Sequence, residues 1–317
     1  MRFIKKTITH DDDYWQARAF LRQVYVLNGR KPISWSAMRL DYWRYHVTAI
    51  EGQKGEAVPT LWETPEGEIV AAIFPEGPGH AHLQVHPAYC SAELVEEMVS
   101  EAETGFYRVK DNGTKRLIVW CHDHDPLRKN VLTRHGFARA ENWEWAERQR
   151  IRNLVDEPIP DFPTAAGYTI RSLGGPEEIP SRSWASWRAF HPDSPDEDYE
   201  GWDWYPQNIQ TQPMYRRDLD IVAIAPDGEV AAFTTLWYDD VTRTGYFEPV
   251  GTVPEHQRKG LSKAVICEGM RRIKAMGAVS IEICGYSIPA NKVYAAVTSE
   301  VCLVYAPWIK ELSLIHI

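Results

Sequence analysis

The stretch VGTVPEHQRKGLSKAVI, residues 250–266, joins a predicted strand to a predicted helix. A β-branched run stops at Pro254, the basic pair Arg258 and Lys259 follows, and Gly260 comes directly before an amphipathic segment. The first N–H groups of a helix have no partner within the helix, and the helix dipole adds positive potential there. Cationic side chains at that end strengthen the attraction for a negative ligand. The sequence therefore predicts an anion-binding site at this junction.

The second half of the chain, on both sides of this stretch, has the pattern of an α/β domain. Pro226-Asp227-Gly228 lies between two apolar runs and predicts a hairpin turn. Apolar periodicity predicts strands at 168–173, 219–225, 229–238, 245–253, 279–286 and 302–309, with helices at 179–190, 261–277 and 290–297. This mixed order indicates a central sheet flanked by helices.

The first half repeats this order more faintly. It has a strand and helix at 82–103, a strand at 115–121 and a helix at 125–137 that ends in Gly-Phe. Aligning Val85 with Thr252 and Leu132 with Tyr294 gives nearly the same offset, which indicates an internal duplication. Residues 153–166 are proline-rich and read as a linker. We therefore expect one domain at 1–152 and a second at 167–311.

Composition excludes several classes of protein. The chain has 317 residues and a net charge of −9, which argues against a surface that binds nucleic acid. Its start has no apolar signal region and no apolar run reaches membrane-spanning length, so we expect a cytoplasmic protein without a membrane partner. The cysteines form no close pair, which suits reduced thiols. The last six residues, 312–317, are what a common sequencing adaptor encodes, and we expect them to be a non-native tail.

The residues around Gly260 resemble the acetyl-CoA signature of the GCN5-related N-acetyltransferases (GNAT), Q/R-x-x-G-x-G/A, here Gln257, Gly260 and Ser262. The segment ANKVYAAV, with Asn291 and Tyr294, resembles a later part of the same family. The resemblance covers most of both halves. It implies two tandem GNAT-like domains, each with a mixed, mostly antiparallel sheet flanked by helices.

The resemblance also implies where acetyl-CoA binds as co-substrate. Backbone N–H groups at 258–262 would hold the diphosphate, and the strand before them would hold the pantetheine arm. The implied coenzyme residues are Val250, Gly251, Thr252, Val253, Gln257, Arg258, Lys259, Gly260, Leu261, Ser262 and Asn291. The alternative is an ordinary capped helix with solvated basic side chains. In the first half Cys90 replaces Gln257 and Glu93 replaces Gly260, so we expect a degenerate copy that binds no coenzyme.

Acetyl transfer to an amine needs a base for the nucleophile and an acid for the leaving thiolate. Tyr294 stands where the family carries its general acid, and the alternative is a core tyrosine. Glu248 is the carboxylate nearest the signature on the preceding strand and is the candidate base. The alternative for Glu248 is a rim carboxylate, with water relaying the proton.

The segment 191–207 interleaves carboxylates with aromatic side chains, a composition that favours a cationic guest. We expect Asp198, Glu200, Trp202 and Asp203 to contact the acceptor; the alternative is a solvated acidic loop. Cys121, His122 and His124 lie too close together in sequence for a closed zinc site, so no metal is expected.

These observations lead to one hypothesis and two alternatives. The leading hypothesis is an acetyl-CoA-dependent N-acetyltransferase that acts on the primary amine of a small molecule, with a catalytic second half. One alternative is transfer to a protein N-terminus or lysine. The other is a catalytically silent acyl-CoA sensor or scaffold. We expect a monomer or a homodimer.

Overall fold

The computed structural model describes residues 2–48 and 57–312, which leaves 313–317 of the expected tail outside the described residues. Within these ranges every helix is too short or too polar to span a lipid bilayer. The chain forms two compact units. Unit 1 consists of Met1–Gln149 and Leu303–Ile317, and unit 2 of Arg150–Cys302.

Unit 1 is built on a mostly antiparallel sheet. Its strand order is β1-β2-β3-β4-β6-β14, with β5 paired to β6 and β7 to β14. The pair β4–β6 is parallel. The elements are β1 Ile4–Thr7, α1 Asp11–Leu27, α2 Ala37–Tyr42, β2 Thr60–Glu63, β3 Ile69–Phe74, β4 His80–Val85, α4 Ala92–Gly105, β5 Arg108–Val109, β6 Lys115–His122, α5 Pro126–Arg134, β7 Ala138–Arg139, the start of β8 Glu147–Asn153, and β14 Leu303–Leu312.

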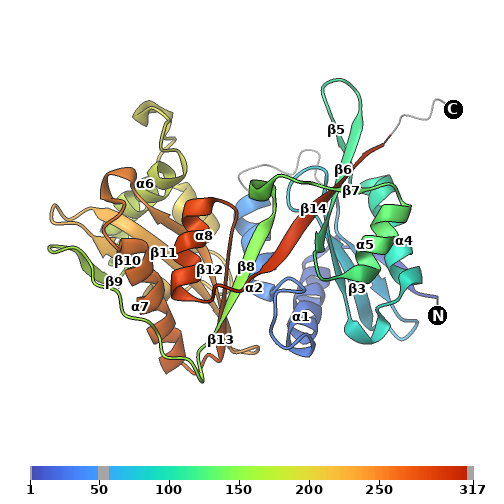
Figure 1. The fold of residues 1–317 in the computed structure, drawn as a ribbon, viewed down its shortest axis with the longest axis horizontal. Helices are drawn as coiled ribbons and strands as arrows, with labels where there is room; N and C mark the ends of the chain where they lie inside the picture. The colour runs from blue at the N-terminus through green and yellow to red at the C-terminus, as the bar shows by residue number, and fades with distance from the viewer. Residues whose placement is uncertain (1, 49–56, 313–317) are drawn as a thin grey trace. The chain divides into compact units, whose positions relative to one another are not determined.

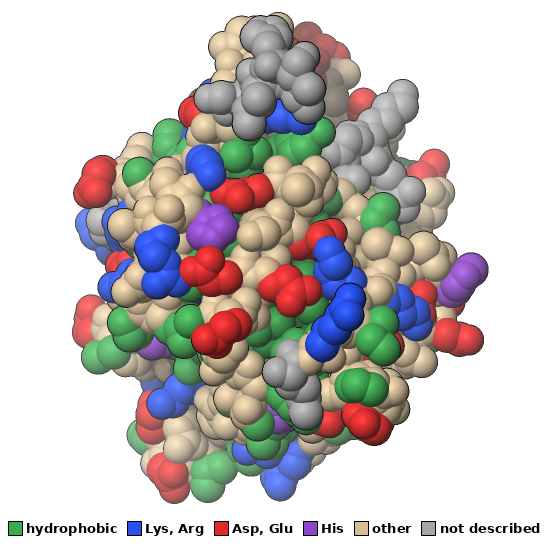
Figure 2. Space-filling model, turned by 90° about the vertical axis from the view of Figure 1, so that its right-hand side faces the viewer, with side chains coloured by type: hydrophobic (Ala, Val, Ile, Leu, Met, Phe, Trp, Pro, Cys, Tyr) green, Lys and Arg blue, Asp and Glu red, His purple; other side chains and the backbone are tan. Residues whose placement is uncertain are grey.

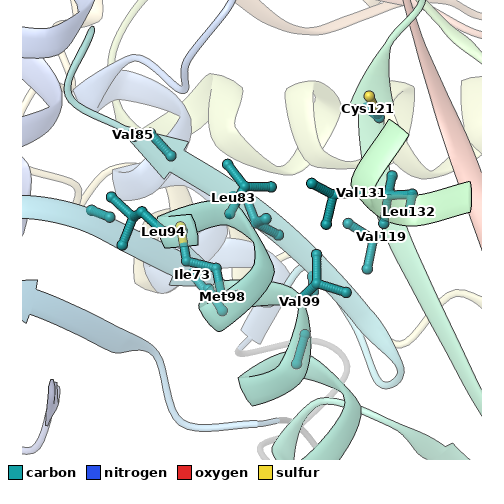
Figure 3. Close-up of a cluster of buried hydrophobic side chains, with 14 of the residues drawn as sticks. Ile73, Leu83, Val85, Leu94, Met98, Val99, Val119, Cys121, Val131 and Leu132 are labelled. Atoms are coloured by element: carbon teal, nitrogen blue, oxygen red, sulfur yellow. The ribbon is translucent and has the colours of Figure 1, made fainter. Parts of the chain in front are cut away.

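Helices cover both faces of the unit 1 sheet. Helices α4 and α5 pack on one face, where Leu94 and Met98 of α4 and Leu132 of α5 lie against strand side chains such as Leu83 (Figure 3). On the other face α1 and α2 pack over β2 and β3. Alternate side chains of a strand point to opposite faces, so β3 can serve both cores at once. The face drawn in Figure 2 carries acidic and basic side chains interspersed, as is typical of a solvated surface.

Unit 2 has the same arrangement. Its strand order continues from the end of β8 as β13-β12-β11-β10-β9, and the pair β12–β13 is parallel. Helix α6 lies on one face of the sheet, while α7 and α8 lie on the other (Figure 1). The elements are β9 Thr169–Ser172, α6 Ile179–Phe190, β10 Asp220–Ile224, β11 Val230–Asp239, β12 Thr244–Thr252, α7 Leu261–Ala275, β13 Ser280–Gly285 and α8 Ile288–Val297.

Helix α7 shows how the sequence sets these elements. Leu261, Val265, Met270 and Ile273 recur at helical spacing and are all buried against the sheet. The helix ends before Gly277, whose φ of +92° is the left-handed conformation that commonly follows a helix C-terminus. The two units thus confirm the expected fold class: each has a mixed, mostly antiparallel sheet flanked by helices.

The division of the chain differs from the expected domain limits in one element. The strand expected at 302–309 was placed in the second domain. As β14, it belongs to unit 1 and pairs antiparallel with β6 from Tyr305 opposite His122 to Leu312 opposite Lys115. Periodicity identifies a strand but does not identify its partner, because pairing is a long-range property.

Candidate functional site

The site begins where two parallel strands of unit 2 part. Strand β12 pairs with β13 over residues 244–247, and its pairing with β11 continues to Thr252. Beyond Phe247, the described residues give β12 no further partner in β13. A shift of register opposite residues 234–236 interrupts the β11–β12 ladder here, and the indole of Trp237 donates to the Glu248 carbonyl at 2.6 Å. One edge of residues 248–252 is therefore left without a neighbouring strand.

The loop from β12 to α7 presents backbone N–H groups at this opening. Arg258 and Gly260 both have left-handed backbones, with φ of 61° and 78°. Gly260 is the N-cap of α7 and supplies no side-chain cap. Leu261, which follows it, is buried and anchors the helix start to the sheet. Uncapped N–H groups at the positive end of a 15-residue helix make an anion-binding geometry.

The polar side chains of this loop contact one another. The hydroxyls of Thr252 and Ser262 lie 2.7 Å apart, and Gln257 donates to the Thr252 carbonyl at 3.4 Å. Arg258 is exposed. Lys259 donates to the Tyr168 hydroxyl at 2.8 Å and to the Glu255 carbonyl at 3.2 Å. The predicted coenzyme residues are thus brought together, and part of their hydrogen-bonding capacity already stabilises the loop.

Two glycines of this region lie where a side chain would collide with a neighbouring group. A Cβ on Gly260 would lie 2.8 Å from the Pro163 carbonyl oxygen, so the linker passes directly over this residue. A Cβ on Gly251 would lie 2.3 Å from the Phe233 ring. Gly260 therefore meets two requirements, a positive φ and a close approach of the linker.

Asn291 lies at the start of α8 and is buried. Its amide nitrogen donates to the carbonyls of Gly285 and Ser287, both at 3.0 Å, and Arg150 donates to its side-chain oxygen. Asn291 therefore holds the β13–α8 turn together, and its expected contact with the coenzyme stays a prediction.

Tyr294 lies one helical turn further along α8 and is buried among the core side chains of unit 2. Its ring packs on Gly285 at the end of β13, where a Cβ would come within 2.8 Å of the ring. Burial, followed by the charge of the Glu248 carboxylate, raises the pKa of Tyr294 well above its ordinary value of 10. The phenol thus stays protonated at neutral pH, within the field of the candidate base.

The acidic segment 191–207 separates into an exposed part and a docked part. Asp198, Glu200, Trp202 and Asp203 are exposed. Tyr199 in contrast donates to Ser183 of α6 at 2.8 Å. The carboxylates therefore face solvent, and their contact with an acceptor stays a prediction.

A buried network that the sequence did not reveal holds the end of this segment. Arg182 of α6 and Asp220 of β10 are fully buried and pair at 3.1 Å. The hydroxyls of Tyr205 and Tyr215 both donate to Asp220. Arg182 also lies 3.9 Å from the centre of the Phe233 ring. An arginine in a polar helix looks solvated in sequence, and only the fold shows that it is internal.

The equivalent helix start in unit 1 is closed. Ser91 caps α4 by accepting from the Leu94 N–H at 3.2 Å. The expectation that Glu93 replaces Gly260 is wrong by two residues: Ser91 is the N-cap that corresponds to Gly260, because the unit 1 loop is shorter, and Glu93 lies in the first turn of α4. A hydrogen bond from the backbone N–H of Glu93, followed by one from Ser91, lowers the pKa of the Glu93 carboxyl. A capped helix start that carries a carboxylate repels a diphosphate.

In the histidine-rich segment 121–125 of unit 1, side chains contact other residues of the fold. His122 bonds to Gln149 at 2.8 Å and stacks on Tyr305 with ring centres 4.3 Å apart. Asp123 pairs with Arg139 at 2.8 Å. Among the described residues no three side chains form a group that could hold a metal ion.

Two units with this sheet topology, one of them with an open helix start beside parted parallel strands, define an acetyltransferase-type fold. Residues 178–297 match the model of the family described as "Acetyltransferase (GNAT) family". The segment that matches this family lies within unit 2.

Similar proteins extend the likeness to both units. A mycothiol acetyltransferase of Arthrobacter sp. (strain FB24) is 22% identical over 260 residues, which are 75% of this chain and 72% of that protein. A GCN5-related N-acetyltransferase from Sphaerobacter thermophilus has a TM-score of 0.62 at 17% identity, with 98% of this chain and 95% of that chain covered. A tandem GNAT protein from the clavulanic acid biosynthesis pathway also has a TM-score of 0.62, at 15% identity, with 98% of each chain covered. The structural likeness supports the tandem fold.

Proposed function

We propose that the protein is an acetyl-CoA-dependent N-acetyltransferase that acts on the primary amine of a small molecule, and that unit 2 carries the reaction. The observation that supports this most is the uncapped, left-handed Gly260 at the start of α7, directly after a strand edge without a neighbour. The corresponding helix start of unit 1 is capped by Ser91. Of these two equivalent helix starts only that of α7 lacks a side-chain cap, which suits one coenzyme site per chain.

In this proposal the coenzyme binds mainly to backbone groups of the protein. The diphosphate accepts from N–H groups at the start of α7, and the pantetheine arm lies along residues 248–252 as an added strand would. The cation of Lys259 adds to the attraction at the loop. A backbone N–H of β12 polarises the thioester carbonyl, which develops negative charge as the amine attacks. No metal is required for these steps.

Glu248 and Tyr294 would divide the proton transfers. Glu248 accepts the proton that the attacking amine loses, directly or through water, and the C–N bond forms as the C–S bond breaks. Tyr294 then donates its phenolic proton to the departing thiolate. Burial, followed by the Glu248 charge, raises the pKa of Tyr294, so protonation of Glu248 removes the second of these contributions at the step where the acid must act. The two groups therefore work best in this order.

The acceptor is the least constrained partner. The exposed carboxylates of 191–207 favour an amine that arrives as a cation. The names of the two relatives, a mycothiol acetyltransferase and a clavulanic acid pathway protein, favour a small molecule over a protein acceptor.

Release of free coenzyme A, measured over a panel of small amines and lysine peptides, tests the proposal. Turnover that requires a small amine and falls on the order of 10²-fold in Tyr294→Phe supports it. Turnover with peptides alone would indicate a protein acetyltransferase. Saturable acetyl-CoA binding without release above the hydrolysis background would indicate an acyl-CoA sensor.

A further inference from the structure

The segment 153–166 makes specific contacts with the loop from β12 to α7, called the coenzyme loop below. Its composition predicts only a linker. The Ala165 N–H donates to the Lys259 carbonyl at 3.3 Å. The Pro163 carbonyl fills the space that a side chain on Gly260 would need. The segment therefore lies against the outer side of the loop.

Tyr168, two residues after this segment, fixes the position of a cation. Its hydroxyl accepts from Lys259 at 2.8 Å and lies 2.8 Å from Nδ1 of His256. An ammonium group only donates, so the Tyr168 oxygen accepts from Lys259 and its proton remains for a neutral His256. Lys259 also donates to the Glu255 carbonyl at 3.2 Å. An ammonium has three N–H groups, so these two contacts leave one N–H for a ligand.

We propose that residues 163–168 form part of the coenzyme site, and that Tyr168 is a positioning residue that holds Lys259 for a phosphate of the coenzyme. This inference rests on the proposed function of unit 2. A free lysine side chain loses much rotational freedom when it binds an anion. Tyr168 removes most of that freedom before the ligand arrives, and such preorganisation improves affinity. Tyr168 thus acts through Lys259.

A double-mutant cycle tests this dependence. The variants are Tyr168→Phe, Lys259→Met and the double variant, with calorimetric titration of coenzyme A and steady-state kinetics as readouts. Tyr168→Phe removes the hydrogen bonds of the hydroxyl to Lys259 and His256. Loss of the contact with Lys259 should raise Kd for coenzyme A and KM for acetyl-CoA by roughly fivefold, with kcat unchanged. Because Tyr168 acts through Lys259, the double variant should bind no more weakly than Lys259→Met alone.

Asp161→Asn is the matched control. Asp161 also lies in the linker, and it pairs with Arg271 near the far end of α7 at 2.9 Å. Its loss should leave Kd unchanged, because this contact does not involve the loop. Equal affinity of Tyr168→Phe and wild type would overturn the inference. The inference would also be overturned if the increase in Kd of the double variant equalled the product of the increases in Tyr168→Phe and Lys259→Met.

Hydrogen exchange on the wild-type protein gives a second test, which does not depend on whether a variant folds correctly. Coenzyme A should slow exchange of the Ala165 amide together with amides of 256–262, because one site includes both. Slowing in 256–262 with no change at Ala165 would exclude the linker. If the wild type shows no saturable binding of coenzyme A, the proposed function fails; if it binds and only the cycle or Ala165 disagrees, this inference alone fails.

Discussion

Unit 1 should lose stability in mild acid because it buries histidines in their neutral form. Burial lowers the pKa of His46, His80 and His122 to about 4 in each case. His82 is fully buried, and burial, followed by the charge of Arg39, lowers its pKa well below the ordinary value. In the unfolded chain a histidine titrates near 6.5. Between these values the unfolded state binds more protons, so stability falls as the pH falls.

The magnitude follows from the two pKa values. At pH 5 a histidine with a folded pKa of about 4 and an unfolded pKa of about 6.5 favours the unfolded state by roughly 30-fold, or about 2 kcal/mol. Three such histidines together give about 6 kcal/mol, which is comparable to the whole free energy of unfolding of many domains, about 5–15 kcal/mol. Unit 1 should therefore unfold at much lower urea concentration at pH 5 than at pH 7.5.

Urea unfolding followed by tryptophan fluorescence measures this loss, and His122→Gln isolates one contribution. Glutamine keeps a polar group next to Gln149 but cannot titrate, so the variant should lose about 2 kcal/mol less than wild type between pH 7.5 and pH 5. The difference between variant and wild type cancels the other titrating groups. For His191→Gln, at an exposed position of unit 2, the free energy of unfolding of unit 1 should fall between pH 7.5 and pH 5 by as much as in wild type. If wild type and His122→Gln lost the same free energy of unfolding between pH 7.5 and pH 5, the reasoning would be refuted.

Three further predictions concern unit 2. Tyr294→Phe should lower kcat on the order of 10²-fold and leave KM for acetyl-CoA unchanged in steady-state assays, because only the donated proton is lost; an unchanged kcat would make Tyr294 a core residue. Gly285→Ala should also lower kcat without weakening coenzyme binding, since its Cβ would lie 2.8 Å from the Tyr294 ring; normal turnover would show that the ring position is not critical. Neutralising Asp198, Glu200 and Asp203 together should raise KM for a cationic amine at low salt, an effect that added salt should reduce because exposed charges are screened over about 8 Å at physiological ionic strength. The same amine KM before and after neutralisation would argue against a cationic acceptor, and equal damage to the KM for acetyl-CoA would point to a misfolded loop.

Local signals in the sequence predicted much of the fold and the position of the loop between β12 and α7. The left-handed conformation of Gly260 and the buried stripe of α7 follow from residue type and spacing, which act over a few residues. The contrast between the two helix starts is also local, but a constant sequence offset placed Glu93 at Gly260, whereas the N-cap that corresponds to Gly260 is Ser91. Such features depend on the chain near them and not on distant partners.

Long-range features could not be predicted in this way. The pairing of β14 with β6 depends on which edge is available once both sheets have formed. The burial of Arg182 beside Asp220 and the contact of Tyr168 with Lys259 join residues far apart in sequence. A polar side chain carries no sequence mark that separates a solvated position from a paired internal one.

The stoichiometry of acetyl-CoA binding tests the central claim most directly, because the claim assigns one coenzyme site to each chain, at the start of α7. Calorimetry should give one acetyl-CoA per chain for the wild type, no binding for Gly260→Glu, and one for Glu93→Gly. Gly277→Glu is the matched control: its φ of +92° gives similar backbone strain at the other end of α7, and it should still bind one. Two acetyl-CoA per chain, or binding that survives in folded Gly260→Glu, would contradict the account.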